Sequence, residues 1–171
     1  MARDKNRLRD FQEALAKRLR QAAELPKRHS RLAVQVGDRG YLLDLDDVSE
    51  VLPLGDITAV PLTQPWFLGV TNVRGTLYAV SDIAAWLGLR VKSDLAARRL
   101  VLLGQRLSRA RAGIVVTRVI GLRQLDEMRP QDTAHAAAWE AGTWLDRDGT
   151  PWIEVDLERL AVDGDFVQIV R

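Results

Sequence analysis

GVTNVRGTLYAVSDIAAWLGL, residues 69–89, places two short apolar runs on either side of the turn NVRG. Short apolar, β-branched runs bounded by a turn predict strands. Gly75 stands where the chain must reverse, which favours a positive φ that glycine adopts at low cost. Asp82 precedes a short apolar run, where its carboxylate can cap a helical turn by accepting backbone N–H bonds. This stretch therefore predicts strand, turn, strand and helical turn.

The same pattern recurs later in the chain. At an offset of 74, Gly149, Thr150, Trp152 and Asp156 repeat the order of Gly75, Thr76, Tyr78 and Asp82. A second self-similarity, at an offset of 71, aligns Leu43, Leu45, Val48 and Val51 with Ile114, Val116, Val119 and Leu122. Repeated order with matching apolar spacing indicates duplication. We predict two related β lobes of roughly 70 residues each, with Gly149 and Asp156 as the second turn and the second cap.

Most of the chain after residue 31 is typical of short strands. Residues 32–36 and 41–45 alternate apolar and polar side chains around a GDRG turn, which predicts a hairpin. Further candidate strands are 48–52, 66–73, 76–80, 99–103, 112–116, 119–122, 142–145 and 151–155. Many short strands with frequent turns favour barrels or a sandwich. Helical pieces are expected only after the two aspartates, at 83–87 and 157–161.

The N-terminal region, residues 1–28, differs from the remainder, residues 29–171. Between residues 4 and 24, apolar side chains recur at helical spacing and predict an amphipathic helix, which Pro26 ends. That apolar stripe is Leu8, Phe11, Leu15, Leu19 and Ala22. Residues 1–31 hold ten Lys and Arg against four Asp and Glu, and the rest holds 15 against 19. A basic arm can bind nucleic acid or anionic lipid or be a solvated helix face, but an acidic body would repel a polyanion.

The sequence lacks the signatures of common enzymes. It has no cysteine, and its two histidines, His29 and His135, do not have the spacing of metal ligands. The acidic run DLDDVSE lacks the pattern of a calcium loop, and there is no phosphate-binding glycine motif or nucleophile elbow. No apolar run is long enough to span a membrane. We therefore expect a cytoplasmic protein without enzymatic activity, metal or cofactor, in which Arg74 is either a recognition residue or a buried brace.

Several segments resemble one family. PWFLGVTNVRGTLYAVSDIAAWLGL is similar to the signature of CheW-like chemotaxis coupling proteins, and GYLLDLDDVSEVLP, AGIVVTRVIGLRQL and DGTPWIEVDLERLA resemble its other strands, so that the resemblance covers about residues 32–161. The leading FQEALAKRLRQAAELP and the run GDITAVPLTQPWFLGVTNVRG resemble the twitching-motility branch, the PilI-like proteins of type IV pilus signalling. Ala79 stands where the family usually has proline.

The resemblance implies a mainly β fold of two small five-stranded SH3-like barrels, with the N-terminal helix and short helical turns added. It implies an adaptor that joins a chemoreceptor cytoplasmic tip to a CheA-like histidine kinase and is recruited to membrane receptor arrays without inserting into the membrane. The positions that match its receptor-binding side are Val48, Glu50, Arg74, Val119 and Leu122. Two alternatives remain from the residues alone: a nucleic-acid-binding barrel that uses the basic arm, and an unrecognised hydrolase.

Overall fold

The computed structural model describes residues 30–91, 95–104, 107, 111–133 and 136–171. The predicted N-terminal helix, the boundary at residue 28, and both histidines lie outside the described residues. The described strands are β1 (Ser30–Val36), β2 (Arg39–Asp44), β3 (Val48–Pro53), β4 (Phe67–Val73), β5 (Thr76–Asp82), β6 (Arg99–Leu103), β7 (Ala112–Val116), β8 (Arg118–Gln124), β9 (Arg129–Gln131), β10 (Glu140–Leu145) and β11 (Pro151–Val155). The described helical turns are η1 (Leu45–Asp47), α2 (Ile83–Trp86), η2 (Leu95–Ala97), η3 (Leu125–Glu127), α3 (Leu157–Leu160) and α4 (Gly164–Val167).

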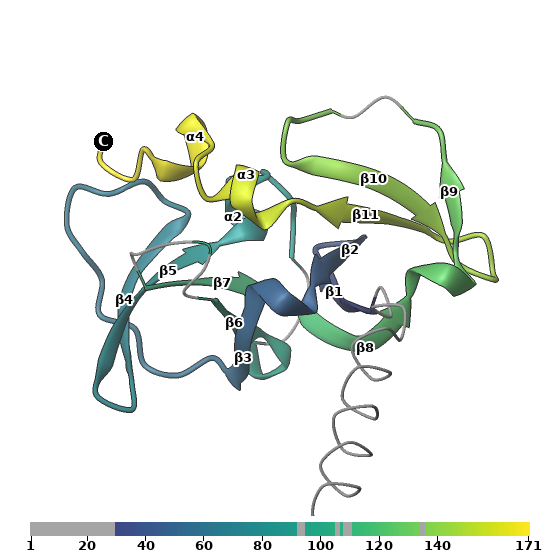
Figure 1. Ribbon diagram of the computed structural model, residues 1–171. Helices are drawn as coiled ribbons and strands as arrows, with labels where there is room; N and C mark the ends of the chain where they lie inside the picture. Colours follow the sequence, from purple (N-terminus) through teal and green to yellow (C-terminus); the bar gives the residue numbers. More distant parts are fainter. Residues whose placement is uncertain (1–29, 92–94, 105–106, 108–110, 134–135) are drawn as a thin grey trace, which may run out of the picture.

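The strands form two sheets that lie side by side in Figure 1. The five-stranded lobe has the order β3-β6-β7-β5-β4, and the six-stranded lobe has the order β8-β1-β2-β11-β10-β9. Both sheets are antiparallel apart from one parallel pair each, β5 with β7 and β11 with β2. The prediction of a mainly β chain with two lobes is therefore confirmed. Five strands were expected in each lobe, but β9 adds a sixth to one of them.

The two sequence repeats do not coincide with the two lobes. The first five strands of the six-stranded lobe, β8-β1-β2-β11-β10, correspond in order and direction to β3-β6-β7-β5-β4. After β2 the chain crosses to β3 in the other lobe, and after β7 it crosses back to β8. Each lobe therefore takes a hairpin from one repeat and the remaining strands from the other, which corrects the expectation of one lobe per repeat.

Three apolar clusters hold the fold together. One fills the five-stranded lobe, with Val80, Leu100, Leu102 and Val115 buried, and a second fills the six-stranded lobe around Leu42 and Trp152. The third is shared by both lobes. Its buried residues are Leu32, Val34, Val36, Tyr41, Leu43, Ile83, Ala84, Val101, Leu103, Ile114, Val116, Trp139, Val155, Leu157 and Leu160. Because this shared core draws on both sheets, separating the lobes would expose it to water.

The alternation of side chains along a strand explains how one sheet serves two cores. In β6, Leu100 and Leu102 face the interior of their own lobe, while Val101 and Leu103 belong to the shared core. Successive side chains of a strand point to opposite faces, so a strand covered on both faces must be apolar throughout. This is why RLVLL and AGIVV are continuous apolar runs. Burial of one leucine side chain contributes about 1.5–3 kcal/mol.

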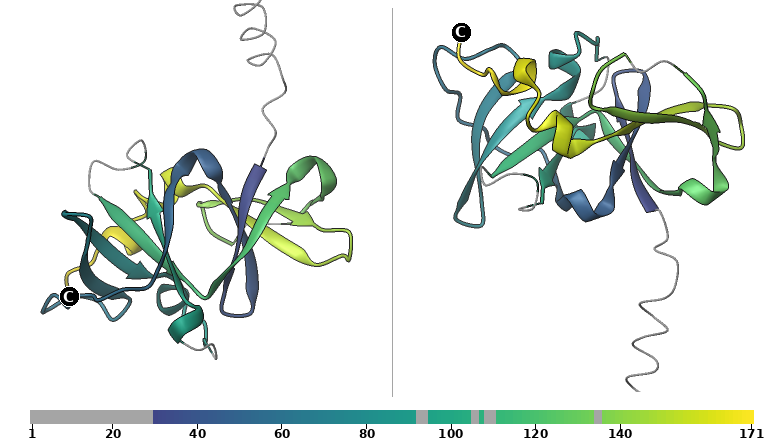
Figure 2. Two further views of the ribbon diagram at one scale, coloured as in Figure 1. Left: turned by 90° about the horizontal axis from the view of Figure 1, so that it is seen from below. Right: turned by 45° about the horizontal axis from the view of Figure 1, so that its top comes forward.

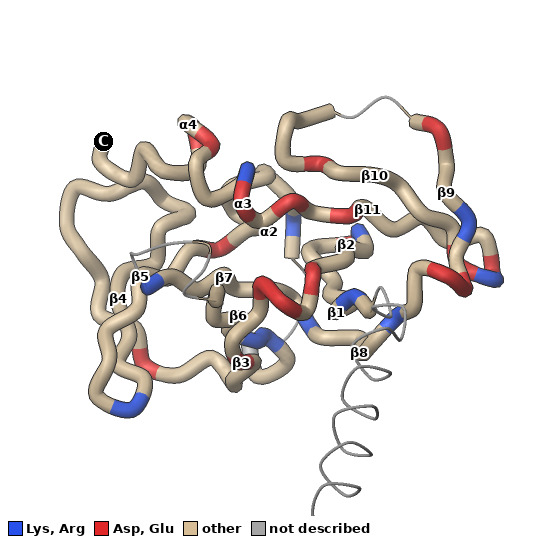
Figure 3. Tube along the Cα trace, in the orientation of Figure 1, with Lys and Arg blue, Asp and Glu red and all other residues tan. Residues whose placement is uncertain are grey.

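The boundary between the lobes has two different ends. On one side of the boundary lie α2 and α3 (Figure 1). Here a row of aromatic rings extends the shared core: the ring centroids of Trp86 and Trp139 lie 5.7 Å apart, and those of Tyr41 and Trp139 lie 6.4 Å apart. Burial raises the pKa of the Tyr41 hydroxyl. Seen from below in Figure 2, β3 and β8 lie in front, one on each lobe. Acidic residues gather in the turns between β2 and β3 and between β8 and β9 (Figure 3).

Candidate functional site

Arg74 lies at the tip of the β4–β5 hairpin. Val73 pairs with Thr76, so the loop consists of Arg74 and Gly75 alone, with φ values of 51° and 83°. Positive φ at both loop residues defines a type I′ turn, whose twist matches that of the strands it joins. Asn72 Oδ1 accepts a hydrogen bond from Gly75 N at 2.8 Å and fixes the bend. The β4–β5 turn, which contains Arg74, lies at the end of the five-stranded lobe in Figure 1.

The guanidinium of Arg74 is held by Glu50 of β3. Nη1 donates to Oε2 at 2.9 Å and Nη2 to Oε1 at 2.7 Å, a bidentate geometry that sets the plane of the guanidinium. The Arg74 side chain is 76% exposed and that of Glu50 29%. An exposed ion pair contributes only about 0–1 kcal/mol to stability. Because the Arg74 side chain is exposed, it is not a buried brace. Glu50 instead holds the guanidinium in a fixed orientation toward solvent.

Val48 and Val119 occupy equivalent positions on the two edge strands that border the shared core. Val48 of β3 is paired with Leu103, and Val119 of β8 is paired with Val34. Residues directly opposite each other in an antiparallel pair lie on the same face, and both partners belong to the shared core. Val48 and Val119 are half-buried and pack against that core. The sequence repeat thus gives two matching apolar edges, one on each lobe.

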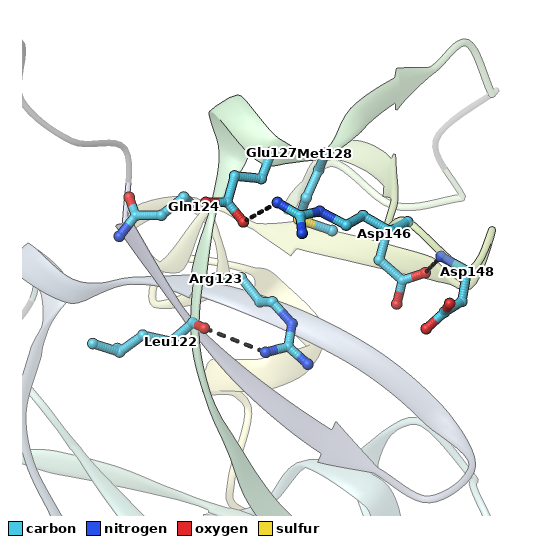
Figure 4. A pocket seen from close by; sticks show the side chains of 8 residues that line it. Leu122, Arg123, Gln124, Glu127, Met128, Asp146 and Asp148 are labelled. Carbon is cyan, nitrogen blue, oxygen red and sulfur yellow. Dashed lines mark hydrogen bonds and ion pairs between the residues drawn. The ribbon is translucent and has the colours of Figure 1, made fainter.

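Leu122 extends the edge contributed by β8. It is paired with Leu32 of the shared core, yet it is 57% exposed. In Figure 4 its side chain points away from Arg123 and Asp146. Its repeat counterpart Val51 on β3 is half-buried against the shared core. We call the surface formed by Val48, Val51, Val119 and Leu122 the inter-lobe face.

A polar pocket of about 430 Å³ borders β8, and Leu122 is among the residues that line it. Arg147 Nη2 lies 3.1 Å from Glu127 Oε2, and the Arg123 guanidinium lies 5.6 Å from the ring centroid of Trp152. Asp146 and Asp148 complete its charged lining. Because acids and bases here are interleaved and partly paired, the pocket offers no field of one sign to an ion.

Asp146 organises the β10–β11 loop, a role that the sequence analysis missed. Its Oδ2 accepts a hydrogen bond from Trp152 Nε1 at 3.0 Å, and its Oδ1 accepts from Asp148 N at 3.0 Å and Thr150 N at 2.9 Å. The Trp152 hydrogen bond is the main cause that lowers the pKa of Asp146, and the two backbone bonds act in the same direction. An aspartate at the start of a DRDGT turn is a local signal for such bonds.

The two aspartates placed before apolar runs both lie at helical turns. Asp82 Oδ1 accepts a hydrogen bond from Ala85 N at 3.2 Å, and Asp156 Oδ1 accepts one from Arg159 N at 2.9 Å. Gly149 has a φ of 78°, close to that of its counterpart at the β4–β5 turn. These residues shape the scaffold on which the inter-lobe face is built.

Within the described ranges, no group of three or more His, Cys, Asp or Glu could hold a metal ion. None of the described helices is both long and apolar enough to cross a membrane. The five residues carried over from the family fall into two places. Val48, Val119 and Leu122 lie on the inter-lobe face, whereas Glu50 of β3 and Arg74 of the β4–β5 turn form an ion pair on the five-stranded lobe. The site therefore offers an apolar surface and an oriented guanidinium, groups that suit recognition of a partner surface.

Two small β lobes share a common core, and apolar side chains lie along their boundary. The chain belongs to the family with a CheW-like domain, whose model matches residues 31–164.

The relatives agree with this assignment. The chain is 33% identical over 104 residues to Protein PilI of Pseudomonas aeruginosa, a match that covers 61% of this chain but only 55% of PilI. It is 27% identical over 110 residues to the chemotaxis protein CheW of Thermotoga maritima, covering 61% of this chain and 68% of that one. The crystal structure of scaffolding protein TtCheW from Thermoanaerobacter tengcongensis superimposes with a TM-score of 0.68 at 20% identity, covering 82% of this chain and 97% of that one. The predicted pair of SH3-like barrels is confirmed.

Proposed function

We propose that this chain is a non-enzymatic adaptor that couples a chemoreceptor cytoplasmic tip to a CheA-like histidine kinase. Its pathway is the control of type IV pili and twitching motility, and its place is the cytoplasmic side of membrane receptor arrays. The likeness to PilI supports the pathway. The inter-lobe face is the observation that carries the proposal, because it presents apolar side chains along the lobe boundary, half-buried at Val48, Val51 and Val119 and exposed at Leu122.

The receptor tip is a helical hairpin, and a helix binds by laying an apolar stripe along a groove. The inter-lobe face meets that requirement with apolar side chains from two edge strands, and Leu122 stands out from it as an exposed anchor. Arg74, oriented by Glu50, lies on the same five-stranded lobe as Val48 and can donate hydrogen bonds to a carboxylate at the end of the receptor hairpin.

The kinase requires a second surface, and the outer end of the five-stranded lobe offers one. Here the loop before β4 and the C-terminal tail are joined by a bridge between Thr63 and Val170. Both segments expose large apolar side chains, and Leu62 is 81% exposed. The exposed residues of this outer patch are Val60, Leu62, Val167 and Val170. Contiguous exposed apolar side chains mark interaction sites.

The nucleic-acid alternative finds less support in the β body. Residues 30–171 hold 16 Lys and Arg against 19 Asp and Glu, a net charge of −3, which disfavours a polyanion. A nucleic-acid-binding protein would show affinity that falls steeply with salt.

A binding measurement with three single variants tests the adaptor. Leu122→Asp should weaken binding of the full-length chain to a purified receptor-tip fragment by at least about fivefold, because an interface anchor contributes more than about 1 kcal/mol. Leu62→Asp should weaken kinase binding and leave receptor binding unchanged. The matched control is Val162→Asp, which alters an exposed valine outside both surfaces and should change neither affinity. Equal receptor affinity for Leu122→Asp and Val162→Asp would overturn the proposed receptor site.

A further inference from the structure

We propose that a pocket on the α2 side of the lobe boundary binds a basic segment of a partner protein and seats an arginine side chain among its tryptophan rings. The pocket has a volume of about 610 Å³. Its described lining comes from both lobes and includes no residue of the inter-lobe face or of the outer patch. Binding here needs neither the receptor nor the kinase of the proposed function, so the pocket is a third surface of the same chain.

The sequence repeat places two tryptophans at this pocket. Trp66 precedes β4 and Trp139 precedes β10, which are equivalent strands of the two lobes. The backbone carbonyl of Trp66 accepts a hydrogen bond from Asp82 N at 2.7 Å, and that of Trp139 accepts one from Asp156 N at 2.8 Å. Each tryptophan is therefore tied to the aspartate that caps α2 or α3. Because both helices lie on this side of the boundary (Figure 1), the two tryptophans line the same pocket.

Contacts between aromatic rings hold the walls of the pocket. Trp86 of α2 supplies a third indole, and we call Trp66, Trp86 and Trp139 the pocket tryptophans. Phe166 of α4 stacks on Trp66, with ring centroids 5.5 Å apart, and meets Trp86 edge-on, with ring centroids 5.1 Å apart. The face of a tryptophan ring attracts a cation more strongly than that of any other side chain. A pocket with three indoles held in place therefore suits a cation.

The charge of the pocket also favours a cation. The described lining residues include one cation, Arg39, and three carboxylates, Glu140, Asp163 and Asp165, a net charge of −2. None of these carboxylates forms an ion pair with another residue that the structure describes. Ala136 N donates to Glu140 Oε2 at 2.8 Å, which holds that carboxylate in place and leaves Oε1 available. An arginine can pair with a carboxylate while the plane of its guanidinium stacks on an indole.

The indole N–H groups indicate that the ligand also carries hydrogen-bond acceptors. Outside the pocket, Trp144 and Trp152 each donate the indole N–H to a carboxylate, at 2.8 and 3.0 Å. No pocket tryptophan forms an indole hydrogen bond to another described residue. Trp139 is only 5% exposed, and a buried indole N–H usually has a partner. The carbonyl oxygens of a peptide backbone would supply such acceptors, which favours a protein segment over a free ammonium ion.

NMR of the isotope-labelled full-length chain tests the pocket, because each of the five tryptophans gives its own indole signal. The probe is the peptide acetyl-Gly-Ala-Arg-Ala-Gly-amide. Its matched control carries citrulline in place of arginine, which keeps the shape of the side chain but removes the charge. We expect the arginine peptide to shift the signals of the pocket tryptophans saturably and to leave those of Trp144 and Trp152 unchanged. The arginine peptide should bind several-fold more tightly than the citrulline peptide.

Charge variants locate the binding. Asp165→Asn and Asp148→Asn each remove one exposed carboxylate, but only Asp165 lines the pocket. Asp165→Asn should weaken binding of the arginine peptide several-fold, whereas Asp148→Asn should leave it unchanged. Arg39→Gln removes the cation of the pocket and should strengthen binding.

The proposal is overturned if the arginine peptide shifts none of the pocket signals or all five indole signals alike, or if the citrulline peptide binds equally well. Equal effects of Asp165→Asn and Asp148→Asn would also overturn it. Tighter binding of a glutamate peptide, weakened by Arg39→Gln, would assign the pocket to an acidic partner instead. Shifts caused by tetramethylammonium but not by the arginine peptide would assign it to a small ammonium ligand. Failure of the adaptor function would appear separately, in the comparison of Leu122→Asp with Val162→Asp.

Discussion

The two copies of the Gly-Thr-aromatic-Asp pattern form the same local structure in different surroundings. Asp82 and Asp156 both cap a four-residue helix. Asp82 is paired with Arg98 at 3.1 Å, with side chains only 10% and 19% exposed. Asp156 is paired with its own helix neighbour Arg159, also at 3.1 Å, but these side chains are 30% and 65% exposed. The sequence pattern therefore determines that each aspartate caps a helix, while its position in the fold determines how much stability is lost when the aspartate is removed.

The turns of the two copies differ as well. The first copy reverses in two residues, Arg74 and Gly75, whereas the second needs the longer loop between Leu145 and Pro151. In the longer loop, Asp146 replaces the missing strand pairing with three hydrogen bonds to its carboxylate. The short β4–β5 turn thus directs the Arg74 side chain toward solvent, whereas the longer β10–β11 loop is stabilised by hydrogen bonds to the Asp146 side chain.

The largest expected effect separates the two capping aspartates. Asp82→Ala should lower the free energy of unfolding by about 3–5 kcal/mol, because it leaves the half-buried Arg98 without its counter-charge as well as removing a cap. Arg98 Nε already lacks a hydrogen-bond partner among the described residues. Asp156→Ala should cost only about 1 kcal/mol, the value of a cap and an exposed pair. Urea denaturation of both variants measures the difference.

A double variant sharpens this comparison. Asp82→Ala/Arg98→Met also removes the guanidinium that Asp82→Ala leaves unpaired, so the double variant should be more stable than Asp82→Ala alone. If Asp82→Ala and Asp156→Ala were equally destabilising, the burial of the first pair would not matter and the comparison would fail.

The second effect concerns the turns and should be the same in both copies. Gly75→Ala and Gly149→Ala should each cost about 1–2 kcal/mol, because an L-residue is strained at their φ values of 83° and 78°. A Cβ at either position would meet no other atom within 4 Å, so backbone strain alone acts. Thermal unfolding of the two variants provides the measurement. A loss confined to one copy would show that the turns are not equivalent.

A smaller effect should follow removal of the Arg74 guanidinium. Arg74→Ala should change the free energy of unfolding by no more than about 0.5–1 kcal/mol, because the ion pair that it loses is exposed. Binding of the receptor-tip fragment should weaken by more than about 1 kcal/mol if the guanidinium contacts it. Denaturant titration and calorimetry on the same preparation compare the two numbers. A large loss of stability with unchanged binding would show that Arg74 has a structural role and does not contact the receptor tip.

The smallest effect is the pH response of the second turn. The pKa of Asp146 is lowered in the folded chain, mainly by the Trp152 hydrogen bond. Its contribution to stability is therefore complete above the unfolded value of about 3.9 and is lost as the pH falls through the lower folded pKa. A carboxyl NMR titration should place this pKa below the ordinary value. Asp146→Asn should make stability less dependent on pH in that acidic range, and an unchanged profile would contradict the assignment.

Local patterns identified much of the fold. Each of the ten predicted strand segments matches an observed strand, with Leu45 in η1 and Trp66 before β4 as the residues that fall outside, and both helical turns follow their aspartates. The short β9 was missed because its three residues, centred on Pro130, have no apolar alternation. The turn α4 was missed although Asp163 Oδ1 accepts hydrogen bonds from Asp165 N and Phe166 N, because Gly164 and Asp165, rather than apolar residues, directly follow the aspartate.

The sequence by itself determined the strands, the reversal at Gly75 and the duplicated order of residues, since alternation, positive φ and capping depend on neighbours along the chain. Only the tertiary structure decided that the repeats exchange strands between lobes, because pairing of distant segments depends on which apolar faces can be buried together. It also decided the environment of each charge. Arg74 meets Glu50 at 2.7 Å in solvent, and Asp82 meets Arg98 in the interior, although nothing in the local sequence distinguishes an exposed pair from a buried one.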